Sequence, residues 1–532
     1  MRLYCLLLTA SCLFPSLSFS QQYLVLEKER NYVAERSQDS NAKFHSSIKP
    51  FLWEPAQQSK APSAVDSTNK IASEKTANIP ASKKQLNFCG TPLLNLEAGY
   101  DLKNHQTSFQ SSIGFMGGGN IFTPKLYYSL NFLAAVSSFP AYIDTFIKRT
   151  GVIPGLGKAH GTDNAYSYQY YSGYLSYSPN KIFNFQFGKD KNFLGDGYRS
   201  MFLSDVSNSY PFLKISTTLW KIKYVCLFAE FKDITAASGM KNDFKNKFGS
   251  FHYLSWNVTK RFNLGLFESV IWQGADENRS RSFDVSYLNP IIFYRPVEYS
   301  LGSSDNVLMG ISFKEKVAKK QQFYGQFMID EFLLKEMGAD IFHDIFPNTK
   351  HHWGWWGNKY GLQLGFKSFD LFTLRNLFFQ TEINYARPFT YTHGSVQQNY
   401  ANYNQPLAHP LGADFAESVS FLHYRYKRWT FETEFLYAVY GKDSVGGRNL
   451  GNNIFLSYTA QKKEYGNYLA QGIKTNLHYM QVKLSYCLIP SSDLMAEAGV
   501  AVRQERNSTS SFNSNFFFIG IKTGITNHYS DF

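Results

Sequence analysis

From about residue 88 to the end, the chain alternates apolar and polar side chains in repeated segments of about ten residues. Examples begin at Leu126, Phe183, Leu377, Trp429 and Met480, and clusters of Gly, Asn, Pro and Lys separate them. A period of two is that of a β-strand, and about ten residues is the length a tilted strand needs to cross a bilayer. The pattern therefore predicts many strands, each with one apolar and one polar face.

The character of the polar face favours a membrane barrel. Positions alternating with Phe431, Phe435 and Tyr437 include Glu432 and Glu434, which can stay charged in a wet lumen. Strands in hydrocarbon must close on themselves, since an unmade backbone hydrogen bond there costs several kcal/mol. Counting roughly sixteen to twenty segments, we predict an all-β fold: a large antiparallel transmembrane β-barrel of about 18 strands over residues 88–532. The aromatic Phe532, after a last alternating strand, fits what outer-membrane assembly machinery expects.

The composition argues against membrane-spanning helices. Aromatic residues make up 17% of the chain, yet the mean hydropathy is −0.31. After the N-terminal leader no run of about eighteen apolar residues occurs, the length that a spanning helix requires. The nearest, residues 130–147, is interrupted by Asn131, Pro140 and Asp144.

The N-terminal region divides into two predicted parts. Residues 1–20 read as a cleaved signal peptide, with Arg2, a short apolar stretch and a Ser18-Phe19-Ser20 cleavage site, which predicts export to the cell outer membrane. Lipidation at Cys12 is the alternative. Residues 21–87 read as a periplasmic, linker-like polar segment, because 57–85 contain no aromatic residue. Within it, residues 23–36 could form one short amphipathic helix.

The cysteine count bears on how the chain is stabilised, and the net charge bears on what it binds. Removing the leader leaves Cys89, Cys226 and Cys487, so no disulfide framework is expected, although one bridge stays open. The net charge is +13, or +12 without Arg2, and no long basic run suggests nucleic acid. The expected partners are anionic: outer-membrane lipid, lipopolysaccharide or acidic polysaccharide. Simple solubility is the other explanation of the charge.

Several motifs together carry a family resemblance. The most distinctive is FGKDKNFLGDGYRSMFLSD at residues 187–205, and others follow at residues 210–212, 287–290, 293–298, 330–332, 355–361 and 403–412. Over about residues 90–532 the chain resembles the Wzi family of capsule-assembly outer-membrane proteins, and more closely its relatives known as the gliding motility protein RemB. The resemblance implies an eighteen-stranded barrel that binds or organises surface polysaccharide, without enzymatic activity or cofactor. It also implies a part in gliding motility or adhesion, with motility or export machinery as further partners.

The same block suggests a binding site. If Phe183, Phe185 and Phe187 face lipid, then Gln186, Gly188 and Asp190 face the lumen, and Gly195-Asp196-Gly197 forms a turn. The charged residues then cluster at a barrel mouth or on a loop folded inward. We predict polysaccharide contacts from Lys189, Asp190, Lys191, Asp196, Tyr198, Arg199 and Asp205. An internal salt network that braces the wall is the competing interpretation.

Trp353, Trp355 and Trp356 form a second candidate, as an aromatic girdle or a sugar-stacking loop. No metal site is expected at the neighbouring His351-His352, because adjacent residues on a strand point to opposite faces. A calcium loop beginning at Asp190 fails because Met201 replaces its bidentate Glu. Nucleophile-elbow, zinc-protease, phosphate-loop and dinucleotide motifs are missing from the sequence.

Three functions therefore compete. The first is the non-enzymatic, polysaccharide-binding or motility barrel. The second is a passive, porin-like diffusion channel, and the third, less favoured, is a barrel-embedded hydrolase with scattered Ser, His and Asp.

Overall fold

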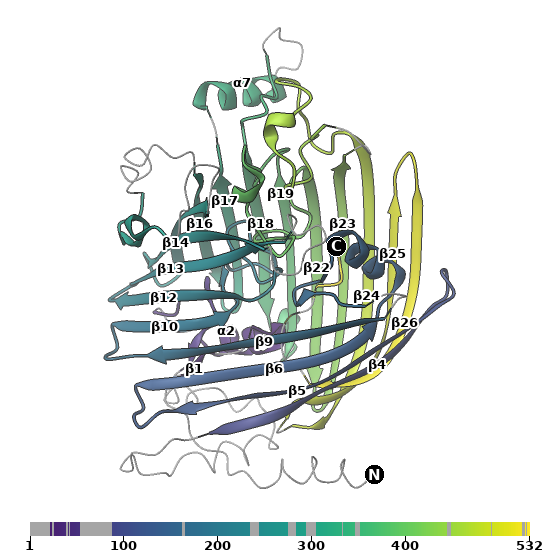
Figure 1. Cartoon of the computed structure of the whole chain (residues 1–532). Helices are drawn as coiled ribbons and strands as arrows, with labels where there is room; N and C mark the ends of the chain where they lie inside the picture. The colour runs from purple at the N-terminus through teal and green to yellow at the C-terminus, as the bar shows by residue number, and fades with distance from the viewer. Residues whose placement is uncertain are drawn as a thin grey trace.

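The computed structural model describes residues 22–23, 26–38, 41, 43–53, 88–161, 165–234, 244–274, 283–293, 305–331, 333–345, 352–443, 448–490, 492–523, 527 and 529–532. Over these residues the chain forms a closed antiparallel barrel of eighteen strands, each paired with its neighbour in sequence and β26 paired with β4 (Figure 1). The predicted fold class and strand number are confirmed. The strands are β4 (Cys89–Asp101), β5 (Gln106–Asn120), β6 (Leu126–Ser138), β9 (Tyr166–Tyr177), β10 (Phe183–Asp190), β12 (Tyr210–Leu219), β13 (Ile222–Asp233), β14 (Lys245–Asn257), β15 (Phe262–Gln273), β16 (Asn306–Ala318), β17 (Gln321–Ile329), β18 (Tyr360–Phe369), β19 (Leu377–Ala386), β22 (Phe415–Tyr426), β23 (Trp429–Lys442), β24 (Ile473–Ile489), β25 (Leu494–Arg506) and β26 (Ser511–Thr523).

The remaining described elements are short. Pairs of two-residue strands are β1 (Gln22–Tyr23) with β3 (Leu52–Trp53), β2 (Ile48–Lys49) with β11 (Phe193–Leu194), β7 (Val152–Ile153) with β8 (Gly157–Lys158), and β20 (Ala401–Asn402) with β21 (Gln405–Pro406). The α-helices are α2 (Lys28–Ser37), α5 (Ala141–Thr150) and α7 (Leu334–Ile345). Four 3₁₀ turns are η1 (Val285–Leu288), η2 (Leu371–Thr373), η3 (Val396–Gln398) and η4 (Tyr458–Ala460). In the described part of the chain, none of the helices has both the length and the apolar character needed to cross a membrane.

The outer face of the barrel is apolar, as the alternation predicts. Phe187 is 64% exposed and Ile519 is 66% exposed, whereas Gln186 between Phe185 and Phe187 is 1% exposed. The same division holds on β19, where Ile383 faces outward and Glu382 and Asn384 are buried in the lumen. A soluble protein does not leave so large an apolar band in water, so this surface is the one that faces lipid.

The two ends of the barrel differ in their connections. At one end, turns of a few residues join β5 to β6, β9 to β10, β12 to β13 and the later pairs in the same phase. The long connections 139–165, 191–209, 330–359, 387–414 and 443–472 all lie at the opposite end. We call this second end the long-loop end. In outer-membrane barrels, long loops are extracellular and short turns are periplasmic. Figure 1 shows α7 beyond the long-loop end and α2 near the other.

The N-terminal region only partly follows the sequence-based prediction. The expected helix is present as α2, one residue past the predicted end. Residues 43–53, however, pack inside the lumen, where His45 Nδ1 lies 2.8 Å from Ser255 Oγ and β2 pairs with β11. These residues are therefore not a free linker, because their polar groups find partners on the inner wall. The signal peptide and residues 57–85 lie outside the described residues.

The three cysteines of the barrel are free: Cys226 and Cys487 are buried and Cys89 is half-buried. The barrel is therefore closed by its hydrogen-bonded strands, without a bridge among these three residues.

Candidate functional site

The connection from β10 to β12, residues 191–209, folds into the lumen. Gly195 has a φ of 149°, and a Cβ there would lie 2.5 Å from Gln326 Nε2 on the wall, so glycine permits this close approach. The chain behind the turn packs Met201, Phe202 and Leu203 at 0% exposure. Of the two placements predicted for this block, the structure has the loop folded inward.

Arg199 lies at the centre of a buried ionic cluster. Its Nη2 donates to Asp531 Oδ2 at 2.8 Å and to Glu417 Oε1 at 3.1 Å. The backbone N–H groups of Tyr198 and Arg199 both donate to the carboxylate of Glu382 at 2.9 Å. Tyr198 and Arg199 thus link the loop to the wall strands β19 and β22 and to the C-terminal tail.

The protonation states of this cluster follow from its contacts. Burial alone would lower the pKa of Arg199, but Asp531 and Glu417 hold that pKa well above its usual value. Burial lowers the pKa of His409, against the pull of Glu417. Because Leu411 N donates to His409 Nδ1, the ring is neutral with its proton on Nε2, which donates to Glu417 Oε2 at 2.8 Å.

Asp205 joins the loop to both chain ends, and Lys191 of the same loop bonds to it. Tyr529 OH donates to Asp205 Oδ1 at 2.6 Å, and Asn527 Nδ2 donates to Asp205 Oδ2 at 2.9 Å. Asn527 Oδ1 in turn accepts from the backbone N–H of Lys28 at 2.9 Å, at the start of α2. Lys191 Nζ donates to the backbone oxygen of Asp205 at 2.9 Å, and burial lowers its pKa to about 8.

Asp196 binds the N-terminal segment to the wall. It accepts a hydrogen bond from Ser46 Oγ and lies 3.8 Å from Lys314 Nζ. Burial alone would raise the pKa of Asp196, but the positive charges of Lys314 and Lys367 lower it. The carboxylate is therefore ionised and paired.

The seven predicted sugar-contacting residues do not form one exposed patch. Lys191, Asp196, Tyr198, Arg199 and Asp205 are buried in the lumen. Asp190 ends β10 on the lumen side, whereas Lys189 lies on the outer side, with Nζ 3.6 Å from the centre of the Tyr171 ring. The contacts of the buried five are those of a salt network, and their predicted role in sugar binding stays a prediction.

Trp353, Trp355 and Trp356 lie in the connection from β17 to β18 at the long-loop end. The rings of Trp355 and Trp356 are 5.8 Å apart, and Trp356 packs on Tyr458 at 4.8 Å. Lys359 Nζ lies 4.2 Å from the centre of the Tyr458 ring. The three tryptophans are half-buried and belong to a loop, so they are not part of a strand-borne girdle. Sugar stacking by them stays a prediction. His351 lies outside the described residues.

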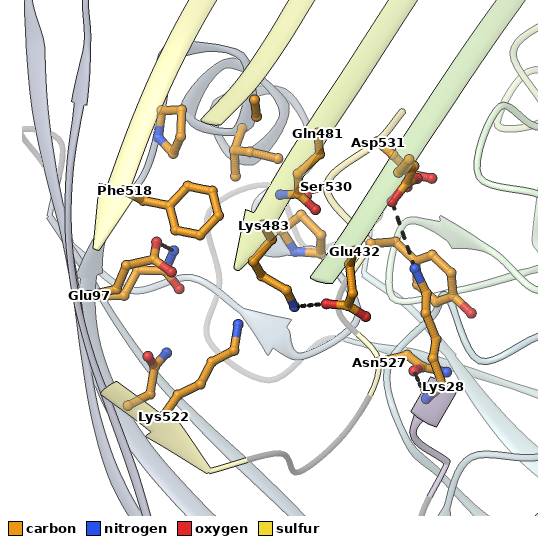
Figure 2. Close-up of a pocket in the computed structure, with 18 of the residues that line it drawn as sticks. Lys28, Glu97, Glu432, Gln481, Lys483, Phe518, Lys522, Asn527, Ser530 and Asp531 are labelled. Atoms are coloured by element: carbon orange, nitrogen blue, oxygen red, sulfur yellow. Dashed lines mark hydrogen bonds and ion pairs between the residues drawn. The ribbon is translucent and has the colours of Figure 1, made fainter. Parts of the chain in front are cut away.

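A cavity of about 310 Å³ opens between the inner wall and the inward-folded segments (Figure 2). Its wall side is formed mainly by β23–β26, β4 and β5, and its other sides by α5, the start of α2, Asn527 and residues 529–531. Figure 2 shows Lys483 directed at Glu432, with Glu97, Lys522 and Phe518 across the space. We call this space the wall cavity. Within the described ranges, no group of three or more His, Cys, Asp or Glu could hold a metal ion.

The sequence analysis missed Glu382, His409, Glu417 and Asp531. Two of them carried a signal: Glu382 falls on the polar face of an alternating strand, and His409 lies in the motif at residues 403–412. It did place Glu432 and Glu434 in the lumen, and both line the wall cavity.

A closed antiparallel barrel with an apolar exterior and a polar, packed interior defines the class: this is an outer-membrane type β-barrel. No protein-family model matches the chain, and no curated protein matches its sequence.

Among solved structures, the chain is similar to Wzi, an outer membrane protein involved in group 1 capsule assembly in Escherichia coli and a carbohydrate-binding β-barrel. The TM-score is 0.54 at 12% identity, over 95% of this chain and 100% of that chain. OprD of Pseudomonas aeruginosa aligns with a TM-score of 0.42 at 11% identity, over 83% of this chain and 96% of that one. OccAB2 of Acinetobacter baumannii aligns with a TM-score of 0.42 at 8% identity, over 82% of this chain and 97% of that one. The similarity to Wzi shows a shared fold.

Proposed function

We propose that this chain is a non-enzymatic outer-membrane β-barrel of the Wzi and RemB type, which binds or organises surface polysaccharide and serves gliding motility or adhesion. In this proposal residues 1–20 are a cleaved signal peptide, residues 21–87 begin in the periplasm, and residues 88–532 form the barrel. Its partners are lipopolysaccharide, surface polysaccharide, and motility or export machinery.

The packed lumen is the observation that carries this proposal. Met201, Phe202, Leu203 and Arg199 are at most 1% exposed, in the middle of the barrel. They are held by the wall and by a second inward connection: Met201 N donates to Gln326 Oε1 of β17 at 2.7 Å, and Tyr400 OH of the connection 387–414 donates to Phe202 O at 2.7 Å. A route for hydrated solutes requires open space at this level, so the packing favours a binding role over diffusion.

Two further observations support polysaccharide as the ligand. Wzi, whose fold is similar, is a carbohydrate-binding barrel in capsule assembly. The aromatic group of Trp355, Trp356 and Tyr458 lies at the long-loop end, the end that faces outward in such barrels. Aromatic faces suit the apolar faces of the sugar rings of a polysaccharide.

The test is a deletion strain scored for both retention of surface polysaccharide and gliding. We expect one or both to fall, and to be restored by the wild-type chain but not by Trp355→Ala/Trp356→Ala. Trp220→Ala is the matched control, because Trp220 is 68% exposed in a short turn at the opposite end. Wild-type behaviour of the deletion strain in both assays would count against the proposal.

The charged residues of the 187–205 motif are tested separately. Lys189→Ala and Arg199→Ala proteins are compared for polysaccharide affinity and thermal stability. Lower affinity at unchanged stability would support a sugar-binding role. Unchanged affinity with lowered stability would leave these residues the structural role alone.

The porin-like channel is the second candidate, and conductance decides between the two. Purified protein is inserted into planar bilayers and the steady current measured. A packed barrel should pass little current, whereas sustained ohmic conductance in the wild-type protein would favour the channel.

A further inference from the structure

The wall cavity is large enough for a small ligand and is built from the inner wall itself. Its volume of about 310 Å³ falls at the lower end of the range of small-molecule sites, about 300–1,000 Å³. The lining combines aromatic rings with carboxylates, amides and lysines. Tyr198 and Asp531 of the ionic cluster at Arg199 reach its edge, whereas the carboxylates, amides and lysines from β4, β5, β24 and β26 belong neither to that cluster nor to the tryptophan loop.

The lysines that line the cavity are already paired with carboxylates. Lys483 Nζ forms an ion pair with Glu432 and lies 3.8 Å from Glu497, and Lys522 Nζ lies 2.5 Å from Glu497. Lys28 Nζ lies 3.8 Å from Glu434 and also contacts the ring of Tyr198 at 4.1 Å. With each of these lysines neutralised, the cavity offers little attraction to a phosphate or a uronic acid.

Hydrogen-bond acceptors remain unused on the wall. Asn95 Oδ1 is shielded from water and bonds to no other group in the described protein. Glu97 accepts from Gln110 Nε2 at 2.8 Å, through one of its two oxygens. A carboxylate accepts more than one bond, so acceptors predominate and suit a ligand that presents hydroxyl donors.

Two aromatic rings form an apolar surface beside these acceptors. Phe516 and Phe518 are stacked, with ring centres 5.9 Å apart and planes inclined by 20°. They have room because Gly99 and Gly499 lie next to them: a Cβ on Gly499 would lie 2.5 Å from Phe518 Cζ, and one on Gly99 would lie 2.2 Å from Phe516 Cζ. The two glycines thus let the rings lie against the wall.

We propose that the wall cavity binds an uncharged saccharide of one or two rings. The apolar face of the sugar packs on Phe518, and its hydroxyl groups donate to Asn95 and Glu97. A saccharide unites one apolar face with a rim of donors, which is the complement of this wall. The inference deepens the proposed function, on which it rests, by assigning the class of sugar and its position inside the barrel.

The experiment measures binding to the purified full chain in detergent, by calorimetry, with glucose, galactose, N-acetylglucosamine and maltose as neutral probes and glucuronate as the anionic one. We expect at least one neutral probe to bind, and glucuronate to bind at least about tenfold more weakly or not at all. Phe518→Leu keeps apolar bulk but removes the ring, and should weaken binding by about tenfold, the effect of one stacking contact of about 1.4 kcal/mol.

The matched control is Phe517→Ala, because Phe517 is the next residue on the same strand but is 49% exposed on the outer face. Its affinity should equal that of the wild type. A second cavity variant, Asn95→Ala, removes an acceptor without disturbing the rings and should also weaken binding.

Three results would overturn the inference: none of the neutral probes binds, glucuronate binds best, or Phe518→Leu and Asn95→Ala bind as the wild type does. The inference and the proposed function can fail separately. If cells lose polysaccharide on deletion of the gene while the purified protein binds no probe, the surface role stands and the cavity site fails. If the cavity variants lose sugar binding but the deletion strain is normal, the cavity site stands and the surface role fails.

Discussion

Arg199 shows how single residues stabilise the packed lumen. A buried guanidinium is costly unless it is paired, and here Glu417 and Asp531 neutralise it while Glu382 holds the backbone on either side. Each partner comes from a different part of the chain. The cluster therefore acts as a cross-link between loop, wall and tail.

Replacing Arg199 by Met should destabilise the barrel by about 3–5 kcal/mol, because removing one member of a buried ion cluster leaves the others uncompensated. The measurement is urea unfolding in micelles, followed by tryptophan fluorescence. Arg261→Met is the control, since Arg261 lies exposed in a short turn and should change stability by less than about 0.5 kcal/mol. Equal stability of the two variants would contradict the role of the cluster.

Lys191 makes the stability of the folded barrel depend on pH. Its pKa is lowered by burial from the ordinary value of 10.5 to about 8. Between these values the unfolded chain binds more protons than the folded one, so stability rises with pH from about 8 to about 10.5, by at most roughly 3 kcal/mol. Below about pH 8 both states are charged and the contribution is constant.

The check is to subtract the unfolding free energy of Lys191→Met from that of the wild type at pH 7, 8, 9 and 10. The difference should be flat between 7 and 8 and then move in favour of the wild type. Lys181→Met, altered at an exposed turn residue, serves as the reference, and its difference from the wild type should show no such rise. A flat Lys191 difference over the whole range would refute the assignment.

At the scale of elements, α2 is fastened to the short-turn end by ion pairs on several sides. Arg36 Nη2 lies 2.8 Å from Asp370, Arg30 Nη2 lies 2.6 Å from Asp493, and Glu35 Oε2 lies 3.0 Å from Lys367. Glu35 is also 3.5 Å from Lys49 of β2. It is the buried member of the set, so most of the anchoring depends on it.

Glu35→Gln should therefore loosen α2 and β2 together, because Lys49 and Lys367 would be left facing each other without a carboxylate. Hydrogen exchange by mass spectrometry should show faster exchange in peptides covering residues 28–37 and 43–53, with the barrel strands unchanged. Arg30→Gln, which removes a more exposed pair, is the control and should alter exchange little. Unchanged protection in Glu35→Gln would show that other contacts hold the segment.

Elements were predictable where a local pattern encodes them. Alternation in β10 and β19 gives both the strand and its lipid-facing side, because lipid and lumen impose opposite polarities on successive residues. The helix α5 was not predicted, since Pro140 at its start and a charged, short sequence resemble a loop. The contacts of residues 43–53 were not predictable either, as they depend on wall residues some 200 positions away.

At the scale of the whole molecule, three chain segments far apart in sequence meet inside one barrel. The N-terminal segment, the loop at residues 191–209 and the C-terminal tail contact one another through Lys28, Asn527 and Asp205. The sequence predicted that the loop's charged residues would cluster, but not their partners Glu417 and Asp531, because closure of the barrel brings those together. Long-range pairing of this kind leaves no periodic trace in a single sequence.

The meeting of these segments leads to a prediction about conductance. The loop at residues 191–209 holds the fully buried Met201, Phe202 and Leu203, whereas the N-terminal segment lies nearer the short-turn end around α2. Replacing residues 193–207 by a short Gly-Ser linker should remove the central packing and raise the single-channel conductance in planar bilayers well above that of the wild type. Tyr210 and the wall strands are left in place, so the barrel can still close.

The deciding control is a variant that lacks residues 22–53, whose conductance is compared with that of the loop replacement. That variant keeps residues 201–203 against Gln326 and Tyr400, so its conductance should stay close to that of the wild type. If the N-terminal deletion opened the barrel and the loop replacement did not, the N-terminal segment would be the barrier. The packing around Phe202 would then only brace the wall, and the N-terminal segment would be the part of the chain that closes the lumen to solutes.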